Sequence, residues 1–127
     1  MKILGTGLDL VEIERITAAM DRHGQRFLQR IFTSEELAYC EKLKFPEKHL
    51  AARFAAKEAV AKAFGAGIGG ALGWLDISVG RNDSGKPAII FSTKAQALCR
   101  ETGVTDSFLS LTHTDTHAAA SVILTGE

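Results

Sequence analysis

A helix-forming run with charged residues at its centre is the part of the sequence best suited to chemistry. The run RFAAKEAVAKAF (residues 53–64) leads into the glycine loop GAGIGG (65–70). Alanine is the best helix former, and its small side chain lets a neighbouring backbone or ligand come close. At about 100° per residue, Glu58 and Lys62 share one stripe, with Arg53 and Lys57 alongside. A carboxylate beside several cations suits a metal and a phosphate group; the alternative is an exposed helix with a Glu58–Lys62 ion pair and a Gly65 cap.

Asp9 follows a short glycine-bearing strand, predicted over residues 3–8, where a helix is expected to begin. An aspartate there is a good N-cap, and Glu12 three residues later completes a capping arrangement. The other interpretation is a hard oxygen ligand for Mg²⁺, which takes one or two protein carboxylates and completes its shell with water and substrate phosphate. Asp9 and Glu58 form such a pair only if the fold joins them, so both interpretations stay open.

Two further segments have the composition of ligand sites but not the order of well-known motifs. The loop 65–70 follows a helix instead of preceding one, and no Lys-Ser/Thr follows it, which excludes a Walker A loop and a dinucleotide fingerprint. It is either a flexible turn or a place where backbone amides approach a phosphate. The segment HTDTH (113–117) lies in a predicted hairpin turn that scatters its histidines, so we expect a histidine hydrogen-bonded to a ligand phosphate instead of a zinc site.

Basic residues recur along the first predicted helix and its continuation. They are Arg15, Arg22, Arg26 and Arg30. Extended as one helix, they lie within roughly 80° of one another, although Gly24 interrupts the run. This is either a solvated cationic face or a dock for an acidic helix, with Phe27 and Met20 as apolar anchors.

Periodicity places these residues on an α+β framework. The predicted elements are a strand over 3–8, a helix after Asp9, a short segment over 26–31, a helix opened by a Thr33–Glu36 capping box, a helix over 47–64, a hairpin of strands 75–80 and 87–91, a helix over 93–101 and strands 108–112 and 118–124. Helices in one half and hairpins in the other predict an α+β fold with a small antiparallel sheet and helices packed on it. An uncovered edge or face of so small a sheet makes oligomerisation an expectation.

Composition excludes several classes of protein. The 127 residues fit one domain, 1–127, and 46% hydrophobic content argues against disorder. Zero formal net charge removes the attraction expected of a general nucleic-acid binder. No apolar run is long enough to cross a bilayer, and no signal-peptide layout opens the chain. Cys40 and Cys99 form no CxxC pair and are expected to be reduced thiols, so we expect a cytoplasmic protein.

Four segments in this order resemble the holo-acyl-carrier-protein synthases, the short bacterial-type 4′-phosphopantetheinyl transferases. They are GTGLDLVE (5–12), RFAAKEA with KAFG (53–59 and 62–65), GKP (85–87) and SLTH (110–113). Each motif is weak alone, but the resemblance extends over the whole chain with fitting spacing. It implies the 4′-phosphopantetheinyl transferase fold.

The resemblance implies a Mg²⁺-dependent transfer of the 4′-phosphopantetheine arm of coenzyme A to a serine of acyl carrier protein. Adenosine 3′,5′-bisphosphate is released, and the holo-carrier serves fatty acid biosynthesis. By the family pattern Asp9 and Glu58 hold Mg²⁺, Glu58 is the base, and Lys62 offsets charge on the leaving phosphate. The residues that match the coenzyme A site are Arg53, Lys62, Gly65, Gly85, Lys86, Pro87, His113 and Thr114.

The resemblance also implies partners. An acidic carrier protein would dock on the first basic helix, where the matching residues are Arg15, Arg22, Arg26 and Phe27. Relatives are homotrimers with active sites between subunits, and His117 departs from the pattern because an aromatic residue is common there. The alternatives are a non-catalytic coenzyme A or nucleotide-binding module and a structural oligomer. The joint presence of Asp9, Glu58 and Lys62 favours the enzyme, because a binding module can lose a metal ligand without penalty.

Overall fold

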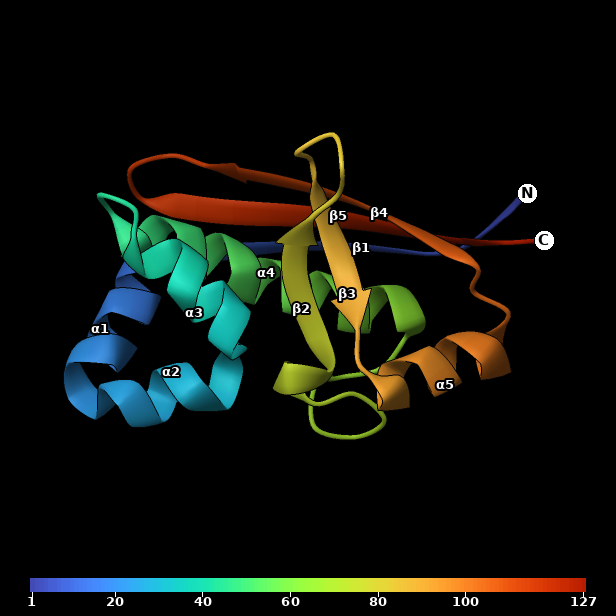
Figure 1. The fold of residues 1–127 in the computed structure, drawn as a ribbon, viewed down its shortest axis with the longest axis horizontal. Helices are drawn as coiled ribbons and strands as arrows, with labels where there is room; N and C mark the ends of the chain where they lie inside the picture. Colours follow the sequence, from blue (N-terminus) through green and yellow to red (C-terminus); the bar gives the residue numbers. More distant parts are fainter.

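The computed structural model describes all residues 1–127 and places one long helix against a sheet. Helix α4 (Pro46–Phe64) lies along one face of a three-stranded antiparallel sheet, as Figure 1 shows. The strand order is β1 (Lys2–Glu12), β5 (His117–Gly126), β4 (Asp106–His113). Alanines at nearly every inward position of α4 are buried, so this helix is the centre of the core and not the exposed helix of the alternative interpretation.

Two glycines of β1 let α4 lie directly against the strand backbone. A Cβ atom at Gly7 would stand 1.8 Å from the Ala59 carbonyl oxygen, and one at Gly5 would stand 1.9 Å from that of Ala63. Both distances are far inside van der Waals contact, so only glycine fits at these two positions. Since side chains of a strand alternate, Asp9 projects from the same face as the two glycines, toward α4.

The other face of the sheet carries no covering layer in the single chain. Alternate residues of β5 point inward and are buried, whereas their neighbours point outward. The outward face exposes large apolar side chains; Leu8 is 67% exposed, Leu10 66% and Phe108 48%. The structure therefore has the uncovered sheet face that the small predicted sheet led us to expect.

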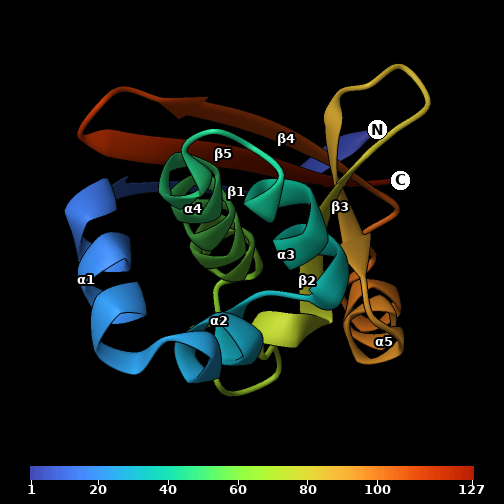
Figure 2. The same cartoon turned by 60° about the vertical axis from the view of Figure 1, so that its left-hand side comes forward.

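Three short helices cover the opposite side of α4, as Figure 2 shows. They are α1 (Ile13–His23), α2 (Gln25–Ile31) and α3 (Ser34–Glu41). Gly24, at φ 56°, ends α1 and turns the chain into α2. The Thr33–Glu36 capping box is confirmed, since Thr33 Oγ1 accepts from the Glu36 amide and Glu36 Oε1 accepts from the Thr33 amide at 2.9 Å.

A hairpin and a helix complete the fold. The 3₁₀ turn η1 (Trp74–Asp76) leads into β2 (Ile77–Arg81), which pairs with β3 (Pro87–Phe91), and α5 (Thr93–Thr102) ends at Gly103. The predicted hairpin and the helix stop are confirmed. The first strand of the hairpin, β2, begins at Ile77 instead of the predicted residue 75. The Asp76 carboxylate accepts a hydrogen bond from the Gly73 amide, which holds residues 73–76 in a turn.

The prediction that Asp9 caps a helix is wrong. β1 continues to Glu12, and α1 begins at Ile13 with Glu12 at its N-cap and no side-chain capping bond. The strand is longer because it pairs with β5 along its whole length, up to Glu12 opposite His117. Tertiary pairing has here outweighed a local capping preference.

The two cysteines of the chain, Cys40 and Cys99, are free thiols, as predicted. Cys40 is a buried residue of α3, and Cys99 is half-buried on α5. None of the helices combines the length and apolar character needed to span a membrane.

Candidate active site

The structure brings Asp9 together with Glu58 and Lys62 of α4. The prediction that Arg53 and Lys57 lie alongside them is wrong, because these two side chains point toward other elements. Lys62 Nζ lies 3.0 Å from Asp9 Oδ1 and donates to the Leu8 carbonyl oxygen at 3.0 Å. The Asp9 side chain is 17% exposed, whereas that of Lys62 is 53% exposed, so the pair lies at the surface with its carboxylate partly shielded. The alternative prediction that Lys62 pairs with Glu58 along the helix is wrong, because close packing of β1 puts Asp9 nearer to the ammonium group.

Glu58 belongs to the same cluster. Partial burial raises the pKa of the Glu58 carboxyl above its ordinary value, and the nearby Asp9 carboxylate raises this pKa further. The cations of Lys62 and Arg15 act on the pKa of Glu58 in the opposite direction. Arg15, predicted only as a docking residue, therefore also contributes charge to this site.

The donor set of this cluster fits a hard divalent cation. The structure contains no group of three or more His, Cys, Asp or Glu side chains arranged to hold a metal. Two neighbouring carboxylates without nitrogen or sulfur ligands are instead the limited protein contribution typical of Mg²⁺, which keeps waters and takes substrate phosphate oxygens. The ammonium group on Asp9 shows that the site already holds a positive charge next to that carboxylate.

A second cluster surrounds the first half of α4 and contains cations without acidic partners. Arg53 is only 4% exposed, and its Nη1 donates to the His49 carbonyl oxygen at 3.2 Å. Its Nε atom has no hydrogen-bond partner, and neither Arg53 nor Arg81 forms an ion pair. Both guanidinium groups lie 4.9 Å from the ring centre of Tyr39, and Arg81 Nη2 donates to the Tyr39 hydroxyl.

Two histidines extend this second cluster. The rings of His49 and His113 meet edge to face, with their centres 5.4 Å apart. Burial lowers the pKa of His49, and the charges of His113, Arg53 and Arg81 lower it further. Converging cations whose charge is not balanced by a carboxylate provide a site for an anion such as a phosphate. Sequence reasoning missed Tyr39, His49 and Arg81, although His49 lies one helical turn before Arg53.

The predicted coenzyme A residues of the hairpin adjoin this cluster through Arg81. Arg81 Nη1 donates to the Gly85 carbonyl oxygen at 2.8 Å, and Gly85 adopts φ 85° in the turn. Asn82 Oδ1 accepts from the Lys86 amide at 3.1 Å, which shapes the loop before Pro87.

The other predicted residues hold turns at the ends of elements. Thr114 Oγ1 accepts from the Thr116 and His117 amides at 3.2 and 3.0 Å in the β4–β5 turn. His117 Nδ1 lies 2.8 Å from Thr116 Oγ1, so its ring belongs to the same turn. Gly65 caps α4 at φ 76°, as predicted.

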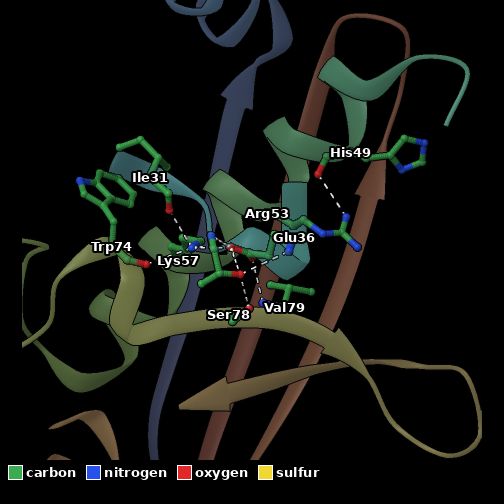
Figure 3. Close-up of polar contacts among 9 residues, drawn as sticks. Ile31, Glu36, His49, Arg53, Lys57, Trp74, Ser78 and Val79 are labelled. Atoms are coloured by element: carbon green, nitrogen blue, oxygen red, sulfur yellow. Dashed lines mark hydrogen bonds and ion pairs between the residues drawn. The ribbon is translucent and has the colours of Figure 1, made fainter. Parts of the chain in front are cut away.

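The two clusters lie on different sides of α4 within one chain. Arg53 and Glu58 are five residues apart, which rotates their side chains by roughly 140° about the helix axis. Figure 3 shows Arg53 beside His49 and above Glu36, on the side of α3 and β2. One chain therefore does not gather all predicted coenzyme A residues around Asp9 and Glu58.

The basic helices form a separate surface. A hollow of about 230 Å³ is lined by His23, Arg26, Phe27 and Arg30. The expectation of one straight stripe from Arg15 to Arg30 is wrong, because the chain turns at Gly24. The two helices nevertheless present basic residues around a partly buried phenylalanine, the arrangement expected of a dock for an acidic partner.

Comparison with known proteins identifies the family. The family model of the 4′-phosphopantetheinyl transferase superfamily matches residues 5–122. The chain belongs to this superfamily. It is similar to the holo-[acyl-carrier-protein] synthase of Koribacter versatilis, at 46% identity over 96% of this chain and 98% of that protein. The family assignment makes the chain a transferase enzyme, as predicted.

Solved structures agree with this assignment. The fold is similar to that of the crystal structure of holo-[acyl-carrier-protein] synthase from Neisseria meningitidis, with a TM-score of 0.90, 36% identity, and coverage of 97% of this chain and 98% of that one. A holo-(acyl-carrier-protein) synthase from Bacillus anthracis, in complex with CoA (3′,5′-ADP), matches with a TM-score of 0.82 and 36% identity over the full length of both chains. The predicted α+β transferase fold is confirmed.

Proposed function

We propose that this protein transfers the 4′-phosphopantetheine group of coenzyme A to a serine of acyl carrier protein, with Mg²⁺ as cofactor. Adenosine 3′,5′-bisphosphate is the second product, and the holo-carrier serves fatty acid biosynthesis. The observation that carries the proposal is the cluster of Asp9, Glu58 and Lys62, formed by segments about fifty residues apart in a chain of this superfamily. A surface ion pair alone requires no second carboxylate at this place.

The residues of the first cluster take complementary roles. Asp9 and Glu58 hold the cation, which when bound neutralises charge on the pyrophosphate of coenzyme A. Glu58 accepts the hydroxyl proton of the carrier serine, and the serine oxygen forms a bond to the phosphorus of the pantetheine phosphate. The phosphorus–oxygen bond to the bisphosphate breaks, and its electron pair leaves with that product. The Lys62 ammonium lies beside these groups and stabilises the charge of the leaving phosphate.

The second cluster suits the phosphates and ribose end of coenzyme A. Arg53 and Arg81 present positive charge without carboxylate partners, His113 lies against His49 beside them, and the Gly85-Lys86-Pro87 turn is attached to Arg81. The Bacillus anthracis relative is in complex with CoA (3′,5′-ADP), which supports a ligand of this kind. Gly65 and Thr114 stay predicted contacts of the same ligand.

A homotrimer with sites between subunits reconciles the two clusters. Because they lie on different sides of α4, one subunit supplies Asp9, Glu58 and Lys62, and its neighbour supplies the residues around Arg53 and His113. The uncovered sheet face with Leu8, Leu10 and Phe108 is available for such contacts. The expected cytoplasmic location stays a prediction.

The acidic carrier docks on the basic helices in this proposal. Arg15 stands beside the first cluster, Arg22 lies in the last turn of the same helix, and Arg26 and Phe27 line the hollow on α2. A carrier bound there reaches Glu58 with its serine, because Arg15 is common to the docking surface and the reaction site.

Incubation with apo-acyl carrier protein, coenzyme A and Mg²⁺, followed by intact-mass measurement, tests the proposal. A phosphopantetheine adduct on the carrier serine is expected, and chelation of Mg²⁺ should prevent it. A non-catalytic coenzyme A-binding module, the second candidate, would bind coenzyme A in calorimetry and give no adduct.

Glu58→Gln tests the assigned base. We expect turnover to fall about a hundredfold or more, because the amide accepts no proton and is a poorer cation ligand. Circular dichroism and the melting temperature should stay those of the wild type. Retained activity would show that a group other than Glu58 accepts the serine proton.

A further inference from the structure

A buried ion pair next to Glu58 is not explained by the proposed chemistry. Lys57 and Glu36 are both fully buried, and Lys57 Nζ lies 2.7 Å from Glu36 Oε1 (Figure 3). Replacing such a pair by apolar residues is often neutral or stabilising, so its presence is weak support for a role in stability alone. The question is therefore what the pair holds in place.

The ammonium group of Lys57 joins four elements. It donates to the Ile31 carbonyl oxygen at 2.8 Å and to the Trp74 carbonyl oxygen at 2.9 Å, in addition to its contact with Glu36. Ile31 is the last residue of α2, whose carbonyl has no partner within its helix. One side chain of α4 thus fixes the end of α2, the first residue of η1 and the first turn of α3.

Glu36 extends these contacts to the hairpin. Its Oε2 accepts from the Val79 amide at 2.9 Å, and its Oε1 accepts from the Thr33 amide at 2.9 Å. Thr33 Oγ1 in turn lies 2.9 Å from Ser78 Oγ. The pair is fully hydrogen-bonded and connects α4 to β2 as well as to the helices.

Lys57 and Glu58 are consecutive, so their directions are linked. Their side chains differ by about 100° around the helix, one toward α2 and α3 and the other toward β1. A rotation or shift of α4 that releases Lys57 also moves Glu58 away from Asp9. The same contacts fix α2, which carries Arg26 and Phe27, relative to this carboxylate.

We propose that Lys57 and Glu36 are a positioning pair that holds the docking helix α2 at a fixed place relative to Glu58. The inference rests on the proposed function, since it assigns α2 to carrier binding and Glu58 to proton transfer. The pair aligns the serine of a docked carrier with Glu58 without touching either substrate. A displacement of about 1 Å in such an alignment is enough to lower turnover strongly.

The test uses the charge-neutral double variant Lys57→Met/Glu36→Gln. A single Lys57→Met variant would leave a buried carboxylate unpaired and unfold the protein for that reason alone. The glutamine keeps an acceptor for the Val79 amide, whereas the Ile31 and Trp74 carbonyls lose their donor. Leu98→Ala in α5, a half-buried side chain remote from these contacts, is the control for a loss of stability without loss of the network.

We expect the double variant to fold but to turn over about tenfold more slowly at temperatures well below its melting point. The KM values for coenzyme A and carrier should stay within about twofold of wild type, because the residues that bind them are unchanged. Trp74 is the single tryptophan, so a shift of its fluorescence emission reports release of η1 from α4. Leu98→Ala should keep the wild-type kcat and emission.

Three results would overturn the inference. The first is a folded double variant with wild-type kcat, which gives the pair a structural role only. The second is an increase in carrier KM with unchanged kcat, which makes the pair part of the docking surface. If this double variant does not fold, the second charge-neutral variant Lys57→Gln/Glu36→Gln, which keeps polar side chains at both positions, replaces it, and a wild-type kcat there is the third. An inactive wild-type protein would instead refute the proposed function, and this inference with it.

Discussion

At the residue scale, surroundings decide what each charged group of this protein contributes. Lys57 and Lys62 lie on one helix and differ by five positions, yet one is fully buried and the other half exposed. The first connects backbone carbonyls of two other elements, whereas the second stands beside a carboxylate at the surface. Residue type alone therefore does not separate a lysine that connects buried elements from one that stands in a surface cluster.

Asp76 gives a prediction about pH and stability. Although partial burial raises the pKa of its carboxyl, hydrogen bonds from Ser92 Oγ at 2.7 Å and the Gly73 amide at 2.8 Å outweigh burial and lower it below 3.8. A lowered folded-state pKa means that the stabilisation is complete above the unfolded value and is lost as the pH falls through the folded value.

The variant Asp76→Asn tests this linkage. Its melting temperature should lie below that of wild type by the same amount at pH 7 and pH 5, and the difference should narrow below about pH 3.8. Calorimetry across this range measures it. A difference that is constant down to pH 3 would show that the charge of Asp76 does not stabilise the fold.

At the element scale, the contact of β1 with α4 creates the first cluster. Gly5 and Gly7 bring the strand backbone against the alanine surface, and this approach sets the distance from Asp9 to Lys62. The alanines of α4 thus favour the helix and also leave room for the backbone of β1 to pack against it. The basic residues of α1 and α2 depend on no such close contact, because they lie on the exposed sides of these two short helices.

Gly7→Ala tests the strand–helix contact. The added methyl group overlaps the Ala59 carbonyl oxygen, so we expect a loss of about 3 kcal/mol in the free energy of unfolding and a lower affinity for Mn²⁺ as a probe of the cation site. Gly70→Ala is the matched control, since a Cβ atom there meets nothing within 4 Å. Equal denaturation midpoints for both variants would contradict the packing argument.

Arg26→Glu tests the docking surface on α2. The charge reversal should raise the carrier KM by roughly three- to tenfold and weaken the dependence of KM on salt, because one attractive contact with an acidic partner is replaced by a repulsive one. Arg26 is chosen over Arg15 because Arg15 also acts on Glu58. Arg100→Glu on α5 is the control and should behave as wild type.

At the scale of the whole molecule, the arrangement of two clusters on different sides of one helix points beyond the single chain. A site assembled from both clusters requires a neighbouring copy, and the proposed closed ring of three gives every subunit such a neighbour. The exposed apolar face of the sheet fits the same conclusion.

Mixing two inactive variants tests this assembly. Glu58→Gln damages the first cluster, and Arg81→Glu damages the second. Co-refolded mixtures should regain activity at those sites where one variant supplies an intact first cluster and the other variant supplies an intact second cluster. In a random trimeric ring about one quarter of the sites are intact. Light scattering should give the mass of three chains. Mixtures that stay inactive would place both clusters of a site in one subunit.

The sequence by itself determined the family, the α+β class, the long alanine helix, the hairpin and the capping box. These are carried by motifs and by local periodicity, which depend only on neighbours in the chain. Asp9 as a strand residue, the partner of Lys62 and the burial of Lys57 were decided by the tertiary structure alone. Pairing with β5 extended β1 past the predicted cap, and the glycine contacts put Asp9 beside α4. Local sequence does not contain these long-range contacts, so the joining of Asp9 to Glu58, left open by spacing, required the folded chain.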